Sequence, residues 1–479
     1  MNERSTAFID SFVHRICFVF CVLNLVLRLF VFETLSYLGR AFLVFTSLCT
    51  RVYYMTNSHK TLQYPHISVL YSMRAYALTV LALLLTPAAV VLASVSGAET
   101  AQVPDIGVAS GAVPLTKLSL DSGAACLDGT PYGFYYVPSK TGSTQWTISI
   151  QGGGWCYNET LCEARAKTRL GSSNFFPSIA SCGCMSVEHG TINKDCNCIY
   201  MPYCDGASFS GFREDPWPVP SSPGSTLHFR GMNNLDATLD FAFEKLGLDQ
   251  ATKVVLTGGS AGGLSTFLHS DHVAERVWKE ANRATLKSAP VVGYFLDHAN
   301  YENNDNSYPN WMKYIYYMQN LTVPALMQTC LDDFPVTPYY CFMSPHMEKY
   351  IATPFFMFNS KYDAWQMTNI LQVPCLAHPA HHKAPCDATE QAAVIKYGQA
   401  FMDDFQPVTK QAKNGAMITS CICHGCNWNS ITLDNKNSYE HYAEWYEGTA
   451  PVSNFHIDPD LPNGGGKMNI TANKCEQYP

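Results

Sequence analysis

A serine stands in a glycine-rich turn whose spacing is typical of nucleophilic catalysis. The stretch KVVLTGGSAGG, residues 253–263, runs from β-branched residues into a cluster of glycines around Ser260. Residues 258–262 match the pattern G-x-S-x-G, in which small neighbours allow a strained turn to hold the serine out for attack. A phosphate-binding loop would need the form G-x-x-x-x-G-K-[ST], and no lysine follows here. A plain helix start, with Ser260 as its cap, is the alternative interpretation.

A base and an orienting carboxylate must accompany the serine, because a serine hydroxyl alone is a weak nucleophile. In α/β hydrolases the order along the chain is serine, acid, histidine. Asp363 comes just after the apolar stretch PFFMFNS, residues 354–360, and His424 lies further on within MITSCICHGCNW. The sequence therefore predicts Ser260, Asp363 and His424 as a catalytic triad. An ordinary turn aspartate is the alternative for Asp363.

Acyl transfer also requires amide groups that stabilise the negative oxygen of the tetrahedral intermediate. One donor is usually the amide after the nucleophile, here that of Ala261, and the others come from a glycine-rich loop after an earlier strand. The stretch WTISIQGGGWC, residues 146–156, supplies such a loop, because glycines let backbone amides approach a substrate. Three consecutive glycines followed by Trp155 favour this interpretation over a plain turn at the end of a strand.

The cysteines around His424 allow a second interpretation, a zinc site. The spacing Cys421-x-Cys423-His424-x-Cys426 resembles a set of zinc ligands, and so do the pairs CGC (182–184) and CNC (196–198). However, 16 of the 19 cysteines lie beyond Ala98, and an even number behind a signal-like segment favours disulfides. We therefore expect no metal and no organic cofactor. The candidate near pairs are Cys156/Cys162, Cys330/Cys341 and Cys375/Cys386.

The segments around these motifs alternate between strand-like and helix-like patterns. A helical stripe of apolar residues covers 234–247, with Asn234 as the expected cap and Gly247 as the expected stop. A second helix should follow the serine turn. Alternation of this kind predicts an α/β fold with a mostly parallel central sheet flanked by helices. The predicted strands cover 133–138, 146–151, 253–257 and 354–360.

The N-terminal part of the chain differs in composition from the rest. Residues 75–98 carry no charge, Arg74 precedes them and small residues stand at 96–98, as is typical of a signal peptide beginning near Met73. A signal anchor is the alternative, since an apolar stretch of this length can span a bilayer. The predicted division is a hydrophobic leader at 1–72, a signal peptide or signal anchor at 73–98, a tether at 99–112 and one domain at 113–479.

Composition limits the class of protein. Of 479 residues, 47% are hydrophobic and 15% are charged, which is enough to bury a large core. The net charge of −8, without long runs of one sign, argues against nucleic-acid binding. The leader, the cysteines and sequons at Asn158, Asn320 and Asn469 predict a secreted or extracellular protein, or one anchored to a membrane of the secretory pathway. We expect a monomer.

Seven stretches together resemble the pectin acetylesterase family, to which the carboxylesterase Notum also belongs. They occur in the family's order over about residues 114–430. The resemblance implies a disulfide-rich α/β-hydrolase-like fold and removal of O-acetyl groups from a polysaccharide such as pectin, without a cofactor. The stretches are CLDGTPYGFYY, QGGGWCYNETLC, YCDGASFSG, FRG, TGGSAGG, YDAWQ and SCICHGC.

On matching positions the resemblance implies the same triad, Ser260, Asp363 and His424. It adds Gly153 and Gly154 to Ala261 as oxyanion donors. The stretch YCDGASFSG would line the site. The substrate contacts that the resemblance suggests are Trp155, Asp205 and Phe209.

The sequence departs from the family's pattern in three places. Gln151 stands where the family usually has Glu, and Cys426 is an additional cysteine beside the histidine. The loop at 172–198, with its CGC and CNC pairs, is unusual and could reshape the acyl or sugar pocket. Three alternatives stay open: a Notum-like fatty-acyl (palmitoleoyl) deacylase, an inactive carbohydrate-binding relative and a zinc-stabilised structural protein.

Overall fold

The structure, a computed structural model, describes residues 113–185, 195–219, 222–321, 327–376, 386–428, 430–450 and 453–462. All of them fall within one unit of the chain, Glu99–Pro479. The segments predicted at 1–72, 73–98 and 99–112 lie outside the described residues. Among the residues that are described, no helix combines the length and the apolar character needed to cross a bilayer.

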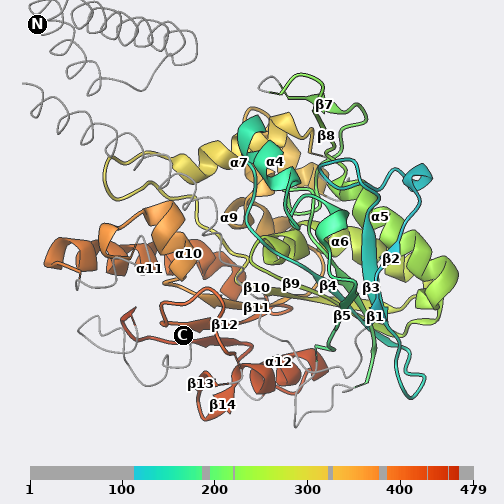
Figure 1. The fold of residues 1–479 in the computed structure, drawn as a ribbon. Coiled ribbons are helices and arrows are strands. Elements are labelled where there is room, and N and C mark those ends of the chain that lie inside the picture. Colours follow the sequence, from blue (N-terminus) through green and yellow to red (C-terminus); the bar gives the residue numbers. More distant parts are fainter. Residues whose placement is uncertain are drawn as a thin grey trace, which may run out of the picture. The chain divides into compact units, whose positions relative to one another are not determined.

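A large twisted sheet forms the centre of the described domain (Figure 1). The strands from β15 to β6 run parallel to one another, and β3 and β2 add an antiparallel edge. The predicted α/β class is therefore confirmed. The strands, in spatial order, are β15 (Phe455–Ile457), β12 (Gly415–Thr419), β11 (Phe356–Ser360), β10 (Thr285–Val291), β9 (Lys253–Gly259), β4 (Gln145–Ile150), β6 (Asn197–Met201), β3 (Gly133–Val137) and β2 (Thr116–Lys117).

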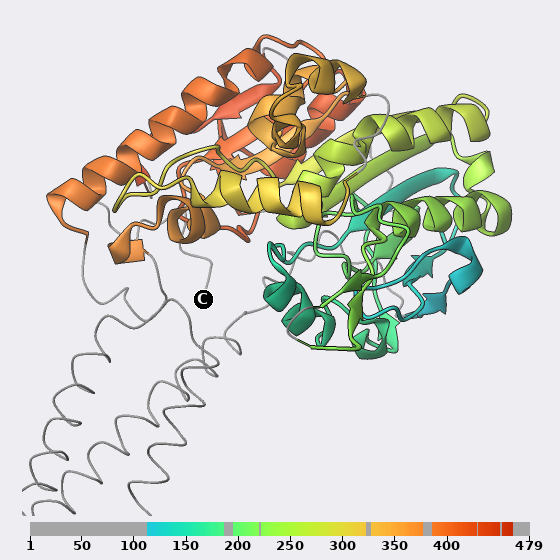
Figure 2. The same ribbon diagram turned by 90° about the horizontal axis from the view of Figure 1, so that it is seen from above.

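Helices cover both faces of this sheet. Figure 1 shows α6 and α12 on opposite faces. Figure 2 shows the long helix α11, drawn in orange, over the part of the sheet that the C-terminal strands make up. The described helices are α4 (Glu159–Ala166), α5 (Gly231–Phe241), α6 (Ala261–Glu280), α7 (Ser307–Met318), α8 (Gln328–Asp333), α9 (Ser344–Met347), α10 (Ala364–Gln366), α11 (Ala388–Thr409) and α12 (Ser438–Glu447).

Buried parallel strands explain the near-continuous apolar runs in the sequence, because both faces of each strand are covered. In β9, Val254 and Leu256 face the core shared with α6 and α11, whereas Val255 faces the core shared with α12. Short antiparallel pairs of strands form separate two-stranded sheets. These are β1 (Val113–Pro114) with β5 (Ile179–Ala180), β7 (Trp217–Pro218) with β8 (Thr226–Leu227), and β13 (Thr432–Leu433) with β14 (Lys436–Asn437).

The predicted cap of the helix at 234–247 is wrong. Helix α5 begins at Gly231, and Asn234 lies inside it, fully buried, with its side-chain amide donating to the carbonyl of Ala125 at 3.0 Å. A distant loop uses the side chain that the local pattern assigned to the helix start. The predicted stop is confirmed, since Gly247 has φ +87° after a π-helical turn at Ala242–Leu246.

Disulfides account for the cysteines of the described residues. The three predicted near pairs are confirmed, and Cys421 is disulfide-bonded as well. Because Cys423 pairs with Cys426, the thiols around His424 are oxidised and the zinc interpretation is wrong. Seven bridges join two cysteines that both lie among the described residues: Cys126–Cys204, Cys156–Cys162, Cys182–Cys198, Cys184–Cys196, Cys330–Cys341, Cys375–Cys386 and Cys423–Cys426.

The CGC and CNC pairs form two neighbouring bridges at the amino ends of the strands. Cys196 and Cys198 flank the start of β6, and the amide of Met185 donates to Thr147 Oγ1 near the start of β4 at 3.2 Å. Catalytic loops of parallel sheets lie at the opposite, carboxyl edge. The two bridges therefore lie away from the catalytic loops, and a role of the 172–198 loop in shaping the pocket stays a prediction.

Candidate active site

The predicted site residues gather at the carboxyl edge of the sheet. Residues 151–156 follow β4, residues 203–211 follow β6, Ser260 follows β9, Asp363 follows β11 and His424 follows β12. These five strands are parallel, so their carboxyl ends meet at one edge. Residues more than 270 positions apart in the sequence are thereby brought into one loop cluster.

Ser260 occupies a strained turn between β9 and α6. Its φ of +59° and ψ of −125° lie in a region that residues other than glycine rarely adopt. The turn is held by the Ser260 amide, which donates to the carbonyl of Val291 at 3.0 Å. A Cβ atom on Gly262 would lie 2.3 Å from the carbonyl oxygen of Ile150, so only glycine fits there. This close packing is the local geometry that a nucleophile turn requires.

Asp363 and His424 form a direct pair. His424 Nδ1 lies 2.8 Å from Asp363 Oδ2, and the aspartate side chain is fully buried. The other carboxylate oxygen, Oδ1, accepts from the amide of Gln366 at 2.9 Å and caps the short helix α10. Because one carboxylate oxygen accepts from the Gln366 amide and the other contacts Nδ1, Asp363 orients the imidazole through Nδ1 alone. Nε2 is then available to accept a proton.

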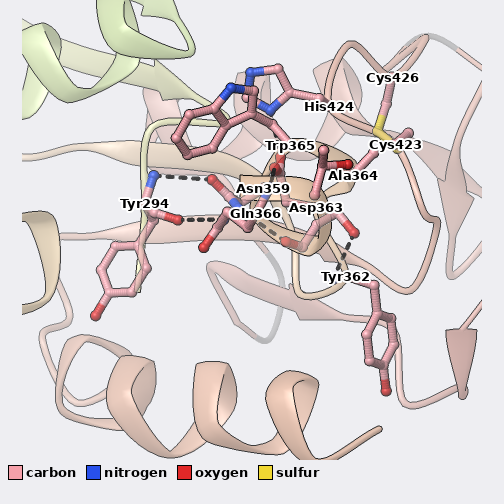
Figure 3. Close-up of polar contacts among 12 residues, drawn as sticks. Tyr294, Asn359, Tyr362, Asp363, Ala364, Trp365, Gln366, Cys423, His424 and Cys426 are labelled. Atoms are coloured by element: carbon pink, nitrogen blue, oxygen red, sulfur yellow. Dashed lines mark hydrogen bonds and ion pairs between the residues drawn. A yellow bond between two sulfur atoms is a disulfide. The ribbon is translucent and has the colours of Figure 1, made fainter. Parts of the chain in front are cut away.

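The turn that carries Asp363 is fixed by a residue that sequence reasoning missed. The side-chain amide of Gln366 donates to the carbonyl of Tyr294 at 2.9 Å, as Figure 3 shows. Its Oε1 accepts from the amide of Leu296 at 3.0 Å and from the hydroxyl of Tyr397 at 2.8 Å. Gln366 thus joins the loops after β10 and β11 with all of its hydrogen-bonding groups. Its place in the YDAWQ stretch was the only signal.

His424 Nε2 is buried and lacks a hydrogen-bond partner among the described residues. No hydrogen bond joins it to Ser260 Oγ in that part of the chain. Such a bond is often long in a serine hydrolase without substrate and tightens in the reacting complex. The structure therefore brings Asp363 and His424 together, places Ser260 on the same edge of the sheet, and leaves Nε2 unused.

The glycine loop after β4 packs directly on the serine turn. A Cβ atom on Gly152 would lie 2.1 Å from the carbonyl oxygen of Gly259 and 3.2 Å from the amide of Ala261. Gly153 and Gly154 both have positive φ, +141° and +64°. Among the described residues, the amides of Gly153, Gly154 and Ala261 donate no hydrogen bond. Three unused amides therefore lie on two segments in contact, which suits an oxyanion hole.

Aromatic rings line the site next to His424. Trp155, Phe295 and Trp365 contact one another edge to face, with ring centroids 5.0–5.5 Å apart. The His424 ring lies 6.2 Å from Phe295 and 6.3 Å from Trp365, and Figure 3 shows the indole of Trp365 beside the imidazole. Tyr308 lies 5.9–6.2 Å from the rings of Trp155, Phe295 and Trp365. Phe295, Tyr308 and Trp365 were not singled out from the sequence.

Asp205 and Phe209 lie behind the site, and both are fully buried. Phe209 packs against Tyr203 and Tyr132. Burial raises the pKa of the Asp205 carboxyl to about 6, against the opposing effects of the Ala207 amide and the Arg165 guanidinium. These positions favour a supporting role, and direct contact with substrate stays a prediction for both residues.

Comparison with known proteins identifies the family. The family model described as pectinacetylesterase matches residues 108–465, which is most of the chain.

The chain belongs to the pectinacetylesterase family.

Two relatives from Arabidopsis thaliana illustrate how much of a pectinacetylesterase the chain covers. It is 31% identical to pectin acetylesterase 5 over 71% of this chain and 81% of the relative. It is 32% identical to pectin acetylesterase 4 over 71% of this chain and 85% of the relative. A palmitoleoyl-protein carboxylesterase NOTUM from Schmidtea mediterranea is 26% identical over 69% of this chain. As a member of this family, the protein is a carboxylic ester hydrolase.

A solved structure of the Wnt deacylase Notum from Drosophila has the same fold. The TM-score is 0.62 at 21% sequence identity, and the match covers 75% of this chain and all of the other. The predicted α/β-hydrolase-like architecture of this pectinacetylesterase-family chain is thereby confirmed.

Proposed function

We propose that this protein removes O-acetyl groups from an acetylated polysaccharide such as pectin by a Ser260–His424–Asp363 mechanism. The observation that carries the proposal is the 2.8 Å contact between His424 Nδ1 and Asp363 Oδ2, on the edge of the sheet where Ser260 occupies its strained turn. Membership of the pectinacetylesterase family supports the acetylated substrate. Export through the secretory pathway agrees with the disulfides and with the signal-like segment at 73–98.

The reaction proceeds in two halves. His424 Nε2 takes the proton of the Ser260 hydroxyl while the serine oxygen attacks the ester carbonyl, and Asp363 accepts a hydrogen bond from Nδ1–H and stabilises the imidazolium. The imidazolium returns the proton to the sugar oxygen, which leaves as an alcohol. Water, deprotonated in turn by His424, attacks the acetyl-enzyme, and acetate and the free serine are released.

The negative oxygen of each tetrahedral intermediate needs donors that are already in place. The amides of Gly153, Gly154 and Ala261 fill this role in the proposal, because they are the unused donors next to Ser260. Preorganised donors of this kind cost no reorganisation when charge develops. No cofactor takes part in any step.

A small acyl group fits the aromatic surroundings of His424. The rings of Trp155, Phe295 and Trp365 contact one another beside His424 and give the site an apolar, aromatic wall. A pocket for a fatty acyl group would instead gain about 0.8 kcal/mol for each methylene that it buries. The preference for an acetylesterase over a Notum-like deacylase also agrees with the identities, 31–32% to the two pectin acetylesterases and 26% to the NOTUM carboxylesterase.

The test is a series of 4-nitrophenyl esters from acetate to palmitate, with acetate release from acetylated pectin measured in parallel. We expect kcat/KM to be highest at acetate or butyrate and to fall steeply by octanoate. Ser260→Ala should lower kcat by roughly 10⁴–10⁶-fold without loss of folding. A maximum at octanoate or beyond would replace the acetylesterase by a lipid deacylase with the same triad, and an active Ser260→Ala variant would end the triad proposal.

A further inference from the structure

Arg165 binds the back of the glycine loop. It lies on α4, and its guanidinium donates from Nη1 to the carbonyl of Gly153 at 2.9 Å and from Nη2 to that of Gly154 at 3.4 Å. Its Nε donates to the carbonyl of Leu170 at 3.0 Å. The guanidinium carbon Cζ lies 4.8 Å from the centre of the Tyr203 ring. Three backbone carbonyls and one aromatic ring therefore fix this side chain.

Arg165 is partly buried. Burial lowers its pKa, and Tyr203 and Asp205 only partly offset that effect. Among the residues that the structure describes, no carboxylate forms an ion pair with Arg165. A guanidinium that is partly removed from water needs compensation from hydrogen bonds. Here that compensation comes mainly from the loop carbonyls, so the contact with the glycine loop is its principal use.

Peptide geometry converts these contacts into the direction of an amide. In a trans peptide the C=O and N–H groups point to opposite sides. When Arg165 holds the carbonyl of Gly153, the N–H of Gly154 must point away from Arg165. Glycine peptides would otherwise rotate easily, since both residues have positive φ and no side chain restricts them. Arg165 thus limits the rotation of the Gly153–Gly154 peptide.

Further contacts connect Arg165 to the serine turn, which carries the Ala261 amide of the proposed oxyanion hole. The Tyr203 hydroxyl, at the far end of the ring that Arg165 covers, accepts from the amide of Ser208 at 3.0 Å. Ser208 Oγ donates to the carbonyl of Ala261 at 2.8 Å and accepts from the indole N–H of Trp155 at 2.8 Å. A continuous set of contacts therefore joins the glycine loop to the serine turn.

We propose that Arg165 is a positioning residue for the oxyanion hole, which holds the amide of Gly154 toward the reacting oxygen through the carbonyl of Gly153. This inference rests on the proposed function. It assigns to Arg165 no contact with substrate. Its effect should therefore appear in the transition state and be small in substrate binding.

The experiment compares Arg165→Met and Arg165→Lys with the unchanged protein on 4-nitrophenyl acetate. Active sites are titrated with a 4-nitrophenyl phosphonate, so that each kcat refers to folded enzyme. For Arg165→Met we expect kcat to fall by about 10²-fold with KM changed less than about 3-fold, as for loss of an oxyanion donor. A lysine ammonium can donate to one of these carbonyls but lacks the planar, forked set of donors of a guanidinium. The kcat of Arg165→Lys should therefore lie between those of the unchanged protein and Arg165→Met.

Phosphonate labelling gives a readout that a purely structural role would not change. The phosphonyl adduct places a polar oxygen in the oxyanion position, so the labelling rate should fall by the same factor as kcat/KM. A folding defect would instead lower the fraction of sites that react, with an unchanged rate for those that remain.

Arg213 offers a matched control. It donates to the carbonyls of Met318 at 2.9 Å and Tyr317 at 3.4 Å and lies 4.5 Å from the ring centre of Trp217. These contacts resemble those of Arg165 but lie outside the glycine loop. Arg213→Met should lose comparable stability, measured by the melting temperature, with kcat unchanged.

The possible outcomes separate this inference from the proposed function. If Arg165→Met and Arg165→Lys keep kcat within about 3-fold, the positioning role is overturned, and the triad stands as long as Ser260→Ala is inactive. If both variants fail to fold while Arg213→Met folds, Arg165 is a structural residue and the inference is overturned as well. If Ser260→Ala remains active, both proposals fall together.

Discussion

At the scale of single residues, the two carboxylate oxygens of Asp363 make different contacts. Oδ2 faces His424 Nδ1, and Oδ1 caps α10 through the amide of Gln366. Asparagine in this place could keep the cap, because its side-chain oxygen can still accept. It would present an N–H₂ group to the imidazole, which would stabilise the wrong tautomer. Catalysis and stability should therefore respond separately to substitution here.

Asp363→Asn should lower kcat by about 10⁴-fold, as in other triads, with little change in melting temperature. Asp363→Ala should lose a similar factor in kcat and, in addition, about 1 kcal/mol of stability from the cap. Kinetics on 4-nitrophenyl acetate and thermal unfolding of the two variants check this. Asparagine and alanine variants of equal stability would show that Oδ1 is not a useful cap, and a fully active Asp363→Asn would remove the residue from the triad.

At the scale of elements, loops at the carboxyl edge carry the chemistry and disulfides restrain them. The bridge Cys423–Cys426 closes a short loop directly around His424. The bridge Cys330–Cys341 closes a longer loop, between α8 and a neighbouring turn. In the chain-entropy account, stabilisation grows with the number of residues in the closed loop. The smaller bridge should therefore matter less for stability, although it lies beside the catalytic histidine.

Replacing both Cys423 and Cys426 by serine should cost about 2 kcal/mol of unfolding free energy, and replacing Cys330 and Cys341 about 3 kcal/mol. Activity should show the opposite order, with kcat reduced about 10-fold or more only for the pair beside His424, because misplacement of a catalytic group is costly. Denaturant unfolding and steady-state kinetics measure the two effects. Equal kcat values for the two double variants would mean that the bridge does not position His424.

At the scale of the whole molecule, buried acids on the α11 side of the sheet link stability to pH. Glu348 is almost fully buried, and burial, together with the nearby Asp404, raises the pKa of its carboxyl to about 8. Burial also raises the pKa of Asp404 to about 6. A raised pKa means that the folded state holds the proton more tightly than the unfolded state. The resulting stabilisation is complete below about pH 4.5 and is lost as the pH rises toward 8.

Glu348→Gln keeps the size of the side chain and removes the charge. The variant should match the unchanged protein near pH 4.5 and exceed its stability at pH 8 by about 2–4 kcal/mol, since each pKa unit corresponds to about 1.4 kcal/mol. Melting temperatures between pH 4.5 and 8 test this. Glu302→Gln, an exposed position, is the control and should change little. A Glu348→Gln variant that loses stability with pH as steeply as the parent would contradict the assignment.

Much of the candidate site was predictable from the sequence, because its reactive residues lie in short motifs of neighbouring residues. The G-x-S-x-G turn, the glycine loop and the order serine, acid, histidine depend on residue types and on strands that end beside them. The near disulfides follow for the same reason, since cysteines close along the chain can meet without a long loop.

The tertiary structure decided what depends on contacts between distant segments. Asn234 donates to the carbonyl of Ala125 and does not cap a helix. Asp205 and Phe209 are fully buried. Arg165 links α4 to the glycine loop. Side chains such as arginine, asparagine and glutamine carry no local signal for these tasks, because their partners are backbone groups brought near only when the sheet forms. The sequence therefore determined which groups could react, and packing alone decided which groups hold them.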